Sequence, residues 1–144
     1  MNWYRTDIYD KAPETWDELL ATAEKSTDLA MGFAVGLSDG SNGTALMETF
    51  TPWLRSAGGD LFDKDGKAIF NSEAGVKVVN FIKQLVEAGT MGKSVLNMAY
   101  DDVVDAFKSG TVYAMDAGTQ RASAIKSSDL ASNFASAPIA GVNG

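Results

Sequence analysis

Three kinds of segment in this sequence have residue types and spacings that chemistry could use. Carboxylates gather in residues 101–105, and residues 63–66 have the Asp-x-Asp-Gly spacing of a calcium loop. Two glycine-rich stretches, residues 36–44 and 118–121, carry hydroxyl and amide side chains. The chemistry would be acid–base catalysis in the first segment and cation binding in the second. In the glycine-rich stretches it would be the binding of anions or hydroxyl groups by backbone N–H groups.

The carboxylates of Asp101, Asp102 and Asp105 are poorly spaced for catalysis. Adjacent residues on a helix point about 100° apart, so Asp101 and Asp102 cannot flank one bond. Acidic side chains at the start of a helix are stabilised by the helix dipole, and this explains the group better than a catalytic pair. A glycoside hydrolase with paired carboxylates remains the alternative function.

The calcium-loop spacing fails at its two end positions. If Gly66 held the invariant glycine, the first and twelfth ligands would be Leu61 and Ser72, and neither has a carboxylate. Asp65-Gly66 is instead a dipeptide that favours a tight hairpin turn. We therefore expect a small hairpin over residues 61–70 and no metal site.

The residue types that are missing exclude several classes of function. Among the 144 residues there is no histidine and no cysteine, which excludes Ser-His-Asp catalysis, most zinc sites, thiol catalysis and Fe–S clusters. Twelve basic against nineteen acidic residues give a net charge of −7, so we expect no nucleic-acid partner. The apolar runs are far shorter than the ~20 residues that span a bilayer. We expect no cofactor.

The elements that must position these segments alternate between strands and helices. The length suits one domain, and the alternation indicates an α/β fold with a short sheet flanked by helices. Apolar spacing and capping residues predict strands over residues 2–6, 31–37, 112–116 and 133–139, and helices over residues 15–23, 45–57, 72–88, 100–109 and 118–126.

Two of the predicted helices carry strong local signals. Thr15 and Glu18 have the spacing of a capping box, in which each side chain accepts a free backbone N–H. The helix before Gly89 is expected to be amphipathic. Its apolar residues at three- and four-residue steps are Val76, Val79, Ile82 and Val86, flanked by Val78, Phe81 and Leu85.

Residues 4–20, 53–60 and 106–115 resemble, in this order, three motifs of the extracellular solute-binding proteins of ABC importers, the family that includes maltose-binding protein. The first segment contains a strand that leads into a Thr-Trp-Asp-Glu-Leu helix, and the second is an aromatic-rich helix that ends in Gly-Gly. The third, Ala-Phe-Lys-Ser-Gly-Thr-Val-Tyr-Ala-Met, is similar to the Phe-x-x-Gly-Lys-x-Ala-Met signature. Residues 118–121 follow it in the expected place.

The resemblance implies a fold with two α/β lobes and a hinge that the chain crosses three times. Residues 1–144 would be a single domain, most of the second (C-terminal) lobe, from the first crossing to just before the second. The first lobe, the return helices and the secretion signal would then be absent. In one departure from the family, Ala12 and Pro13 are adjacent, which implies a shortened loop.

The function that the resemblance implies is transport and not catalysis. The chain would be the substrate-binding component of an ABC transporter, binding a sugar or oligosaccharide in the inter-lobe cleft. Its partners would be the missing first lobe and the membrane permease. The parent protein would be periplasmic or extracellular, and lipid- or membrane-associated. Surfaces that the rest of the protein would cover should be apolar, so we also expect a homodimer. A third alternative is that the chain is a stand-alone lobe that serves only as a folding or design scaffold and has no activity.

Carried over by position, the ligand-facing residues fall into two groups. They are Asn42, Gly43, Thr44 and Glu48 around one helix start, and Gly118, Thr119, Gln120 and Arg121 around another, with Tyr4 at the hinge. Amides, hydroxyls and guanidinium donors can pair with sugar hydroxyls. Many relatives have a Trp in place of Gln120, so the resemblance carries over no aromatic stacking there. Trp53 is expected in the core.

Overall fold

The computed structural model describes residues 1–38 and 43–144. A three-stranded antiparallel sheet in the order β2-β1-β3 lies at its centre, formed by β1 (Asn2–Arg5), β2 (Ala114–Asp116) and β3 (Phe134–Ala137). The helices are α1 (Trp16–Ala21), α2 (Thr44–Ser56), α3 (Glu73–Glu87), α4 (Tyr100–Lys108) and α5 (Ala122–Lys126). Short 3-10 helices are η1 (Thr22–Lys25), η3 (Lys93–Asn97) and η4 (Thr119–Arg121). The mixed α/β class is therefore confirmed.

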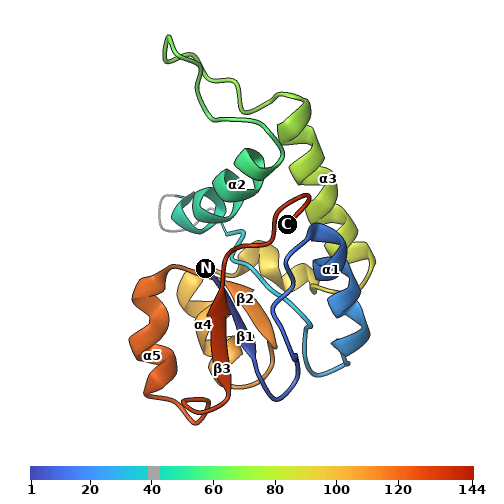
Figure 1. The fold of residues 1–144 in the computed structure, drawn as a ribbon, viewed down its shortest axis with the longest axis vertical. Helices are drawn as coiled ribbons and strands as arrows, with labels where there is room; N and C mark the ends of the chain where they lie inside the picture. Colours follow the sequence, from blue (N-terminus) through green and yellow to red (C-terminus); the bar gives the residue numbers. More distant parts are fainter. Residues whose placement is uncertain (39–42) are drawn as a thin grey trace.

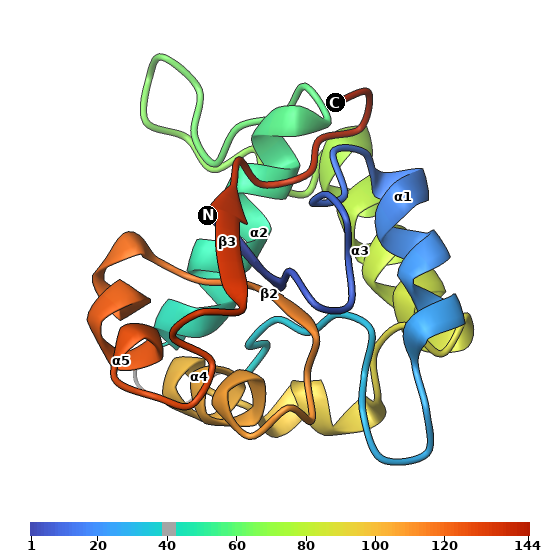
Figure 2. The ribbon, with the colours of Figure 1, turned by 60° about the horizontal axis from the view of Figure 1, so that its bottom comes forward.

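The helices divide into two groups around the sheet. Figures 1 and 2 show α1 and α3 together on the opposite side of the sheet from α4 and α5, while α2 lies beyond the end where β1 begins. Helix α3 packs against both α1 and α2. None of the described helices is long and apolar enough to cross a membrane.

The start of α1 confirms half of the predicted capping box. The Thr15 hydroxyl accepts the backbone N–H of Glu18 at 3.1 Å, as expected. The Glu18 carboxylate does not return to Thr15 but accepts the backbone N–H of Glu14 at 2.6 Å. It also forms an ion pair with Lys11 at 3.0 Å, which draws the carboxylate toward the preceding loop.

The residues that flank the predicted stripe on α3 form its buried face. Val78, Phe81 and Leu85 are buried, whereas the side chains of Val76 and Val79 are 56% and 58% exposed. Both sets have helical spacing, so tertiary partners decide which set is buried. The Phe81 ring stacks on Trp16 with centroids 4.1 Å apart and packs edge-on against Trp53 at 5.2 Å.

This aromatic cluster is the centre of the core. Trp53, predicted as a core residue, is fully buried, and Phe33 lies 6.4 Å from it, centroid to centroid. Aromatic side chains bury 150–250 Å² each and dominate the energetics of a core. The cluster therefore fixes α1, α2 and α3 against one another and against the segment that contains Phe33.

Two expected strand regions are not continuous strands. Residues 31–37 are extended beside β2 but make only isolated parallel bridges, Met31 to Val112 and Ala34 to Met115. Residues 61–70 form the expected turn, with Gly66 at a φ of +78° and one antiparallel bridge from Phe62 to Ala68. Figure 1 shows this hairpin projecting away from the body of the molecule, so no neighbouring strand extends its pairing.

Candidate functional site

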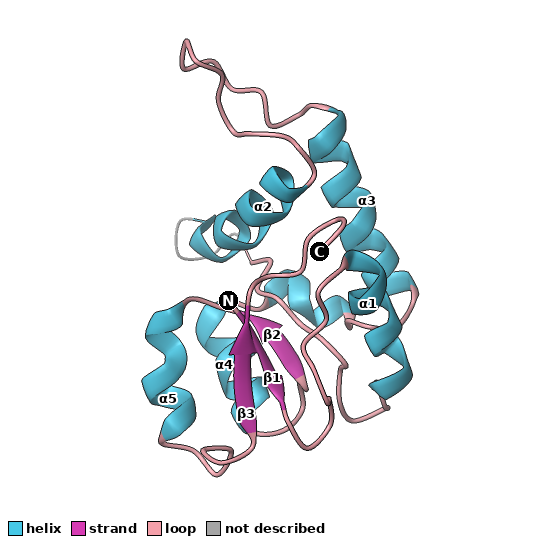
Figure 3. Cartoon of the chain, viewed as in Figure 1, coloured by secondary structure: helices cyan, strands magenta, loops and turns pink. Residues whose placement is uncertain are grey.

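A cleft of about 460 Å³ opens where β1 begins and β2 ends, next to α2. Figure 3 shows the convergence of these elements below α2. The lining residues come from five parts of the chain and are Met1, Met47, Glu48, Thr51, Pro52, Tyr100, Asp116, Ala117, Gly118 and Ile139. The cleft is therefore built at a point where many elements meet, which is a common place for a small-molecule site.

Helix α2 provides one wall of the cleft. Gly43 begins the helix in the left-handed region, with a φ of 70°, which a residue without Cβ adopts at no steric cost. Glu48, Thr51 and Pro52 then follow along the wall. Because Pro52 has no N–H, it cannot donate the helical hydrogen bond to the carbonyl of Glu48. The wall thus offers a carboxylate and a hydroxyl.

The floor of the cleft is a buried polar pair on neighbouring strands. The β1–β2 register places Asn2 opposite Asp116, and the Asn2 amide donates to Asp116 Oδ1 at 3.0 Å. Burial raises the pKa of Asp116 to about 6, although the Asn2 hydrogen bond acts in the opposite direction. Asp116 Oδ2 and Asn2 Oδ1 are both buried without a hydrogen-bond partner. The Asp116 carboxyl is therefore a nearly buried part of the floor, and its protonation state sets the charge there.

A chain of polar contacts runs from Glu48 on the α2 wall to Tyr100 on α4, and from Tyr100 to Arg121, which does not itself line the cleft. Burial, and then the nearby Glu48 carboxylate that accepts its hydrogen bond, raise the pKa of Tyr100. The Arg121 guanidinium lies 5.8 Å from the centre of the Tyr100 ring and forms an ion pair with Asp101. Glu48, Tyr100, Arg121 and Asp101 thus connect α2, α4 and η4, and of these four residues Glu48 and Tyr100 line the cleft.

The remaining acidic residues at the start of α4 have structural partners. Asp102 accepts the backbone N–H of Ala99 at 2.8 Å and so caps the helix. Asp105 forms an ion pair with Lys108 at 2.9 Å. These contacts give Asp102 and Asp105 structural roles at the start and along the side of α4.

The sequence-predicted residues are only partly brought together. Glu48 and Gly118 line the cleft, and Arg121 reaches it through Tyr100. Gly43 and Thr44 lie at the start of α2, and Thr119 and Gln120 are exposed on η4. Tyr4 lies on β1, two residues from Asn2. Asn42 lies outside the described residues. The amide end of the Gln120 side chain lies over the Cα of Gly118, in space that a Cβ at position 118 would take.

Sequence reasoning missed Tyr100, Asp116 and Thr51. The sequence predicts Tyr100 only as the first residue of a helix and Asp116 only as the last residue of a strand. The available signal was the position of Asp116 two residues before Gly118, because a polar residue at the end of a strand lies close to the loop that follows it.

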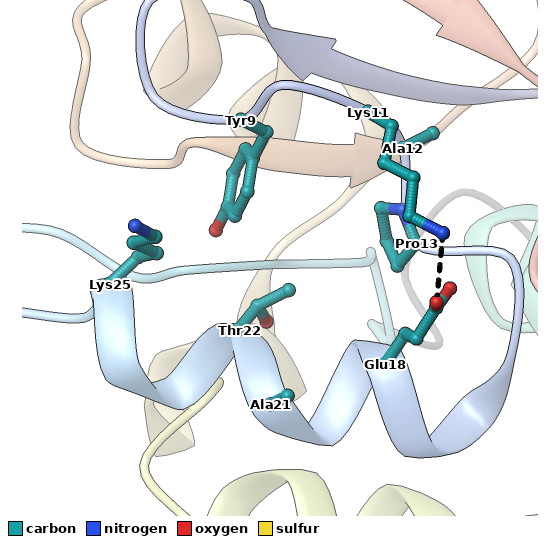
Figure 4. Close-up of a pocket in the computed structure, with 8 residues that line it drawn as sticks. All are labelled: Tyr9, Lys11, Ala12, Pro13, Glu18, Ala21, Thr22 and Lys25. Atoms are coloured by element: carbon teal, nitrogen blue, oxygen red, sulfur yellow. Dashed lines mark hydrogen bonds and ion pairs between the residues drawn. The ribbon is translucent and has the colours of Figure 1, made fainter.

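A smaller hollow of about 200 Å³ lies between α1 and the loop that precedes it (Figure 4). Three of its polar side chains, Tyr9, Lys11 and Glu18, are already engaged. Lys11 binds Glu18 at 3.0 Å, and the Tyr9 hydroxyl donates to the carbonyl of Gly32 at 2.7 Å. Among residues 1–38 and 43–144, no three acidic side chains form a group that could hold a metal ion. The cleft beside α2 is therefore the better candidate for a binding site.

Comparisons with known proteins agree on one family. The family model described as bacterial extracellular solute-binding protein matches residues 1–144. The structure of maltose-bound MalE3 of T. maritima has a TM-score of 0.85 and 26% identity, covering 97% of this chain and 38% of that one. The GacH receptor of Streptomyces glaucescens GLA.O, solved unliganded and with acarbose, has a TM-score of 0.77 and 25% identity, covering 97% and 37%.

One curated relative matches about half of this chain and a much smaller share of its own length. It is the protein y4oP of Sinorhizobium fredii (strain NBRC 101917 / NGR234), named as a probable amino-acid ABC transporter periplasmic-binding protein. The two sequences are 34% identical over 83 residues, which is 55% of this chain and 18% of the relative. The chain thus spans well under half of the length of each protein that it is compared with here.

Proposed function

Because the chain belongs to the bacterial extracellular solute-binding protein family, we propose that it is the substrate-binding part of an ABC importer and not an enzyme. Residues 1–144 form most of the second lobe of a two-lobe protein, and the cleft beside α2 is one half of its ligand site. The observation that carries this proposal is the cleft itself, at which β1, β2, α2, α4 and the Gly118 turn converge.

The ligand that we propose is a sugar or oligosaccharide. The cleft offers the Glu48 carboxylate, the Thr51 hydroxyl, the Tyr100 ring and the backbone around Gly118, and no Lys or Arg side chain is among the described residues that line it. Carboxylates and hydroxyls pair with sugar hydroxyls, and an aromatic ring suits the apolar face of a sugar. The maltose and acarbose in the two structural relatives support this class.

An amino-acid ligand, which the name of the curated relative suggests, fits the cleft less well. The carboxylate of a free amino acid needs a positive partner, because an unpaired charge is costly to remove from water. Apart from the Met1 ammonium group, which acts on Asp116, the positive group that we describe beside the cleft is Arg121, and its guanidinium is already paired with Asp101. The carboxylate would also face Glu48, which has the same charge.

The other partners that we propose are those of a two-lobe protein of an importer. The first lobe closes over the cleft by a hinge motion, and the closed form docks on the membrane permease. The remaining predicted ligand residues, Tyr4, Asn42, Gly43, Thr44, Thr119 and Gln120, contact the ligand or the hinge only in that closed form. The parent protein works in the periplasm or outside the cell, lipid- or membrane-associated. We also propose that the present chain alone forms a homodimer.

A glycoside hydrolase is the alternative to test. Glu48 and Asp116 are two carboxylic acids that line one cleft, and such a pair is what a glycoside hydrolase uses. Asp116, however, has one oxygen bonded to Asn2 and the other buried, so neither oxygen is free to reach a glycosidic bond. Turnover of a chromogenic glycoside panel that is lost in Glu48→Gln or Asp116→Asn would overturn the transport proposal.

The proposal is tested by titrating the ¹⁵N-labelled chain with maltose and following amide shifts. Shifts should appear first at Glu48, Tyr100, Gly118 and Arg121, and Glu48→Gln should weaken them by removing an acceptor. Lys126→Gln on α5, which is exposed and does not line the cleft, is the matched control and should change nothing. Shifts confined to the hollow beside α1, or no shift with any of a panel of sugars at tens of millimolar, would contradict the assignment of the site.

A further inference from the structure

The side chains that carry charge in the lining of the cleft beside α2 have one sign. Glu48 and Asp116 are carboxylic acids, and no Lys or Arg side chain is among the described residues that line the cleft. Clefts lined by charge of one sign focus the electric field and concentrate ions of the opposite sign. The lining therefore favours a ligand that carries positive charge.

The floor of the cleft has acceptor atoms that lack donors. Asp116 is 5% exposed and Asn2 is fully buried, and the Asn2 amide donates to Asp116 Oδ1 at 3.0 Å. Asp116 Oδ2 and Asn2 Oδ1 are buried without a hydrogen-bond partner. Because a buried acceptor without a donor costs free energy, a positive charge placed above these two oxygens reduces that cost. The floor thus acts on a ligand through its negative potential.

Glu48 is the carboxylate that a ligand in the cleft can reach. It is exposed on α2, lines the cleft and accepts a hydrogen bond from the Tyr100 side chain. An ionised carboxylate has about four acceptor positions, so this bond holds Glu48 in place and leaves acceptors for a ligand. A primary ammonium group has three N–H donors and no acceptor. It therefore matches Glu48 in charge and in hydrogen bonding.

The α-ammonium group of Met1 shows how a cation acts on this floor. Met1 lines the cleft, and its positive charge favours the ionised form of Asp116 and lowers the pKa of that carboxyl, against the larger effect of burial. The Asp116 charge also acts on Tyr100 on the other side of the cleft. A positive group in the cleft is therefore within electrostatic reach of the buried carboxylate.

We propose that the cleft beside α2 prefers a sugar that carries a protonated amino group, with the ammonium group bonded to Glu48 above the Asp116 floor. This inference rests on the proposed function and narrows its ligand class. A neutral sugar with the same ring can bond to Glu48 through a hydroxyl but brings no charge. An N-acetylated sugar has a neutral amide at the same position. The amino sugar is therefore preferred over both.

Titration of the ¹⁵N-labelled full chain with D-glucosamine, D-glucose and N-acetyl-D-glucosamine at pH 7 and low salt tests this preference. D-glucosamine should bind about fivefold more tightly than either neutral sugar, the upper range for a partly exposed ion pair. Glu48→Gln and Asp116→Asn should each reduce this ratio, because each removes a negative charge from the lining. Acetylation of the Met1 amino group should increase it, because a competing positive charge is lost.

The matched control is Asp129→Asn, which removes one negative charge from an exposed residue outside the lining and should preserve the ratio. Equal dissociation constants for the three sugars, with shifts at the cleft, would overturn the preference and leave the proposed function standing. Shifts at the cleft with none of the sugars would contradict both. A preference that survives Glu48→Gln and Asp116→Asn would arise from the net charge of −7 and would also overturn the inference.

Discussion

At the scale of the residue, Asp116 is a buried acid whose protonation is coupled to folding. Burial raises its pKa to about 6, above the value of about 3.9 of an unfolded aspartate. A group with a raised folded pKa contributes stability that is complete below pH 4 and is lost as the pH rises through 6. The ionised form should therefore destabilise the fold by about 3 kcal/mol at pH 7, as an upper estimate.

Asp116→Asn should remove this coupling, because the amide is neutral at every pH and can still accept from Asn2. Urea unfolding between pH 4 and 7 should show the variant gaining stability relative to the wild-type chain as the pH rises. The exposed Asp129→Asn should behave like the wild type. An equal pH dependence in Asp116→Asn and the wild type would show that Asp116 titrates normally.

Glu48 and Gly118 were predicted from the resemblance by position, because family motifs fix the place of a helix start and of a glycine turn in the sequence. Tyr100 and Asp116 could not be predicted, because their place in the cleft depends on the register of β1 against β2 and on the packing of α4. Asp116 is opposite Asn2 only because the two strands are antiparallel with this register. That pairing joins residues 114 positions apart, and no local pattern indicates it.

At the scale of the element, Thr15 fixes where α1 begins. Its hydroxyl accepts one of the N–H groups that have no partner within the helix. Thr15→Ala should lower the free energy of unfolding by about 1 kcal/mol. Urea denaturation measures this, with Ser123→Ala, an exposed position on α5, as the control that should change little. An effect no larger than that of the control would mean that the Glu18 contacts alone hold the helix start.

Helix positions were predictable from capping and breaking residues, whereas the buried face of α3 was not. Valines occupy both sides of this helix, so apolar periodicity allows two stripes. The choice depends on Trp16 and Trp53, which come from other helices and stack against Phe81. The segment at residues 31–37 is similar, because its apolar residues are buried as expected but its backbone makes only isolated bridges.

At the scale of the whole molecule, the core is continuous from the sheet to α1, α2 and α3. Fully buried side chains such as Phe33, Trp53, Leu85 and Met115 belong to one cluster. A chain of 144 residues can bury roughly 68–70% of its unfolded surface, which is enough for independent folding. We therefore expect one cooperative thermal transition and well-dispersed amide signals. A broad melt with weak amide dispersion would contradict this.

Ligand affinity also depends on the whole molecule, because the proposed site is shared between two lobes. One lobe makes about half of the contacts and leaves the ligand open to water on the other side. Half of a micromolar binding free energy of about 8 kcal/mol is about 4 kcal/mol, which corresponds to a millimolar dissociation constant. An isolated lobe also has no hinge to hold the site in its binding conformation, which lowers the affinity further.

Calorimetry of the isolated chain with maltose should therefore give a millimolar dissociation constant or no measurable heat. Glu48→Gln should abolish any residual signal, and Lys126→Gln should preserve it. A low-micromolar constant for any monosaccharide or disaccharide would mean that residues 1–144 hold a complete site, because half of the contacts cannot supply that free energy.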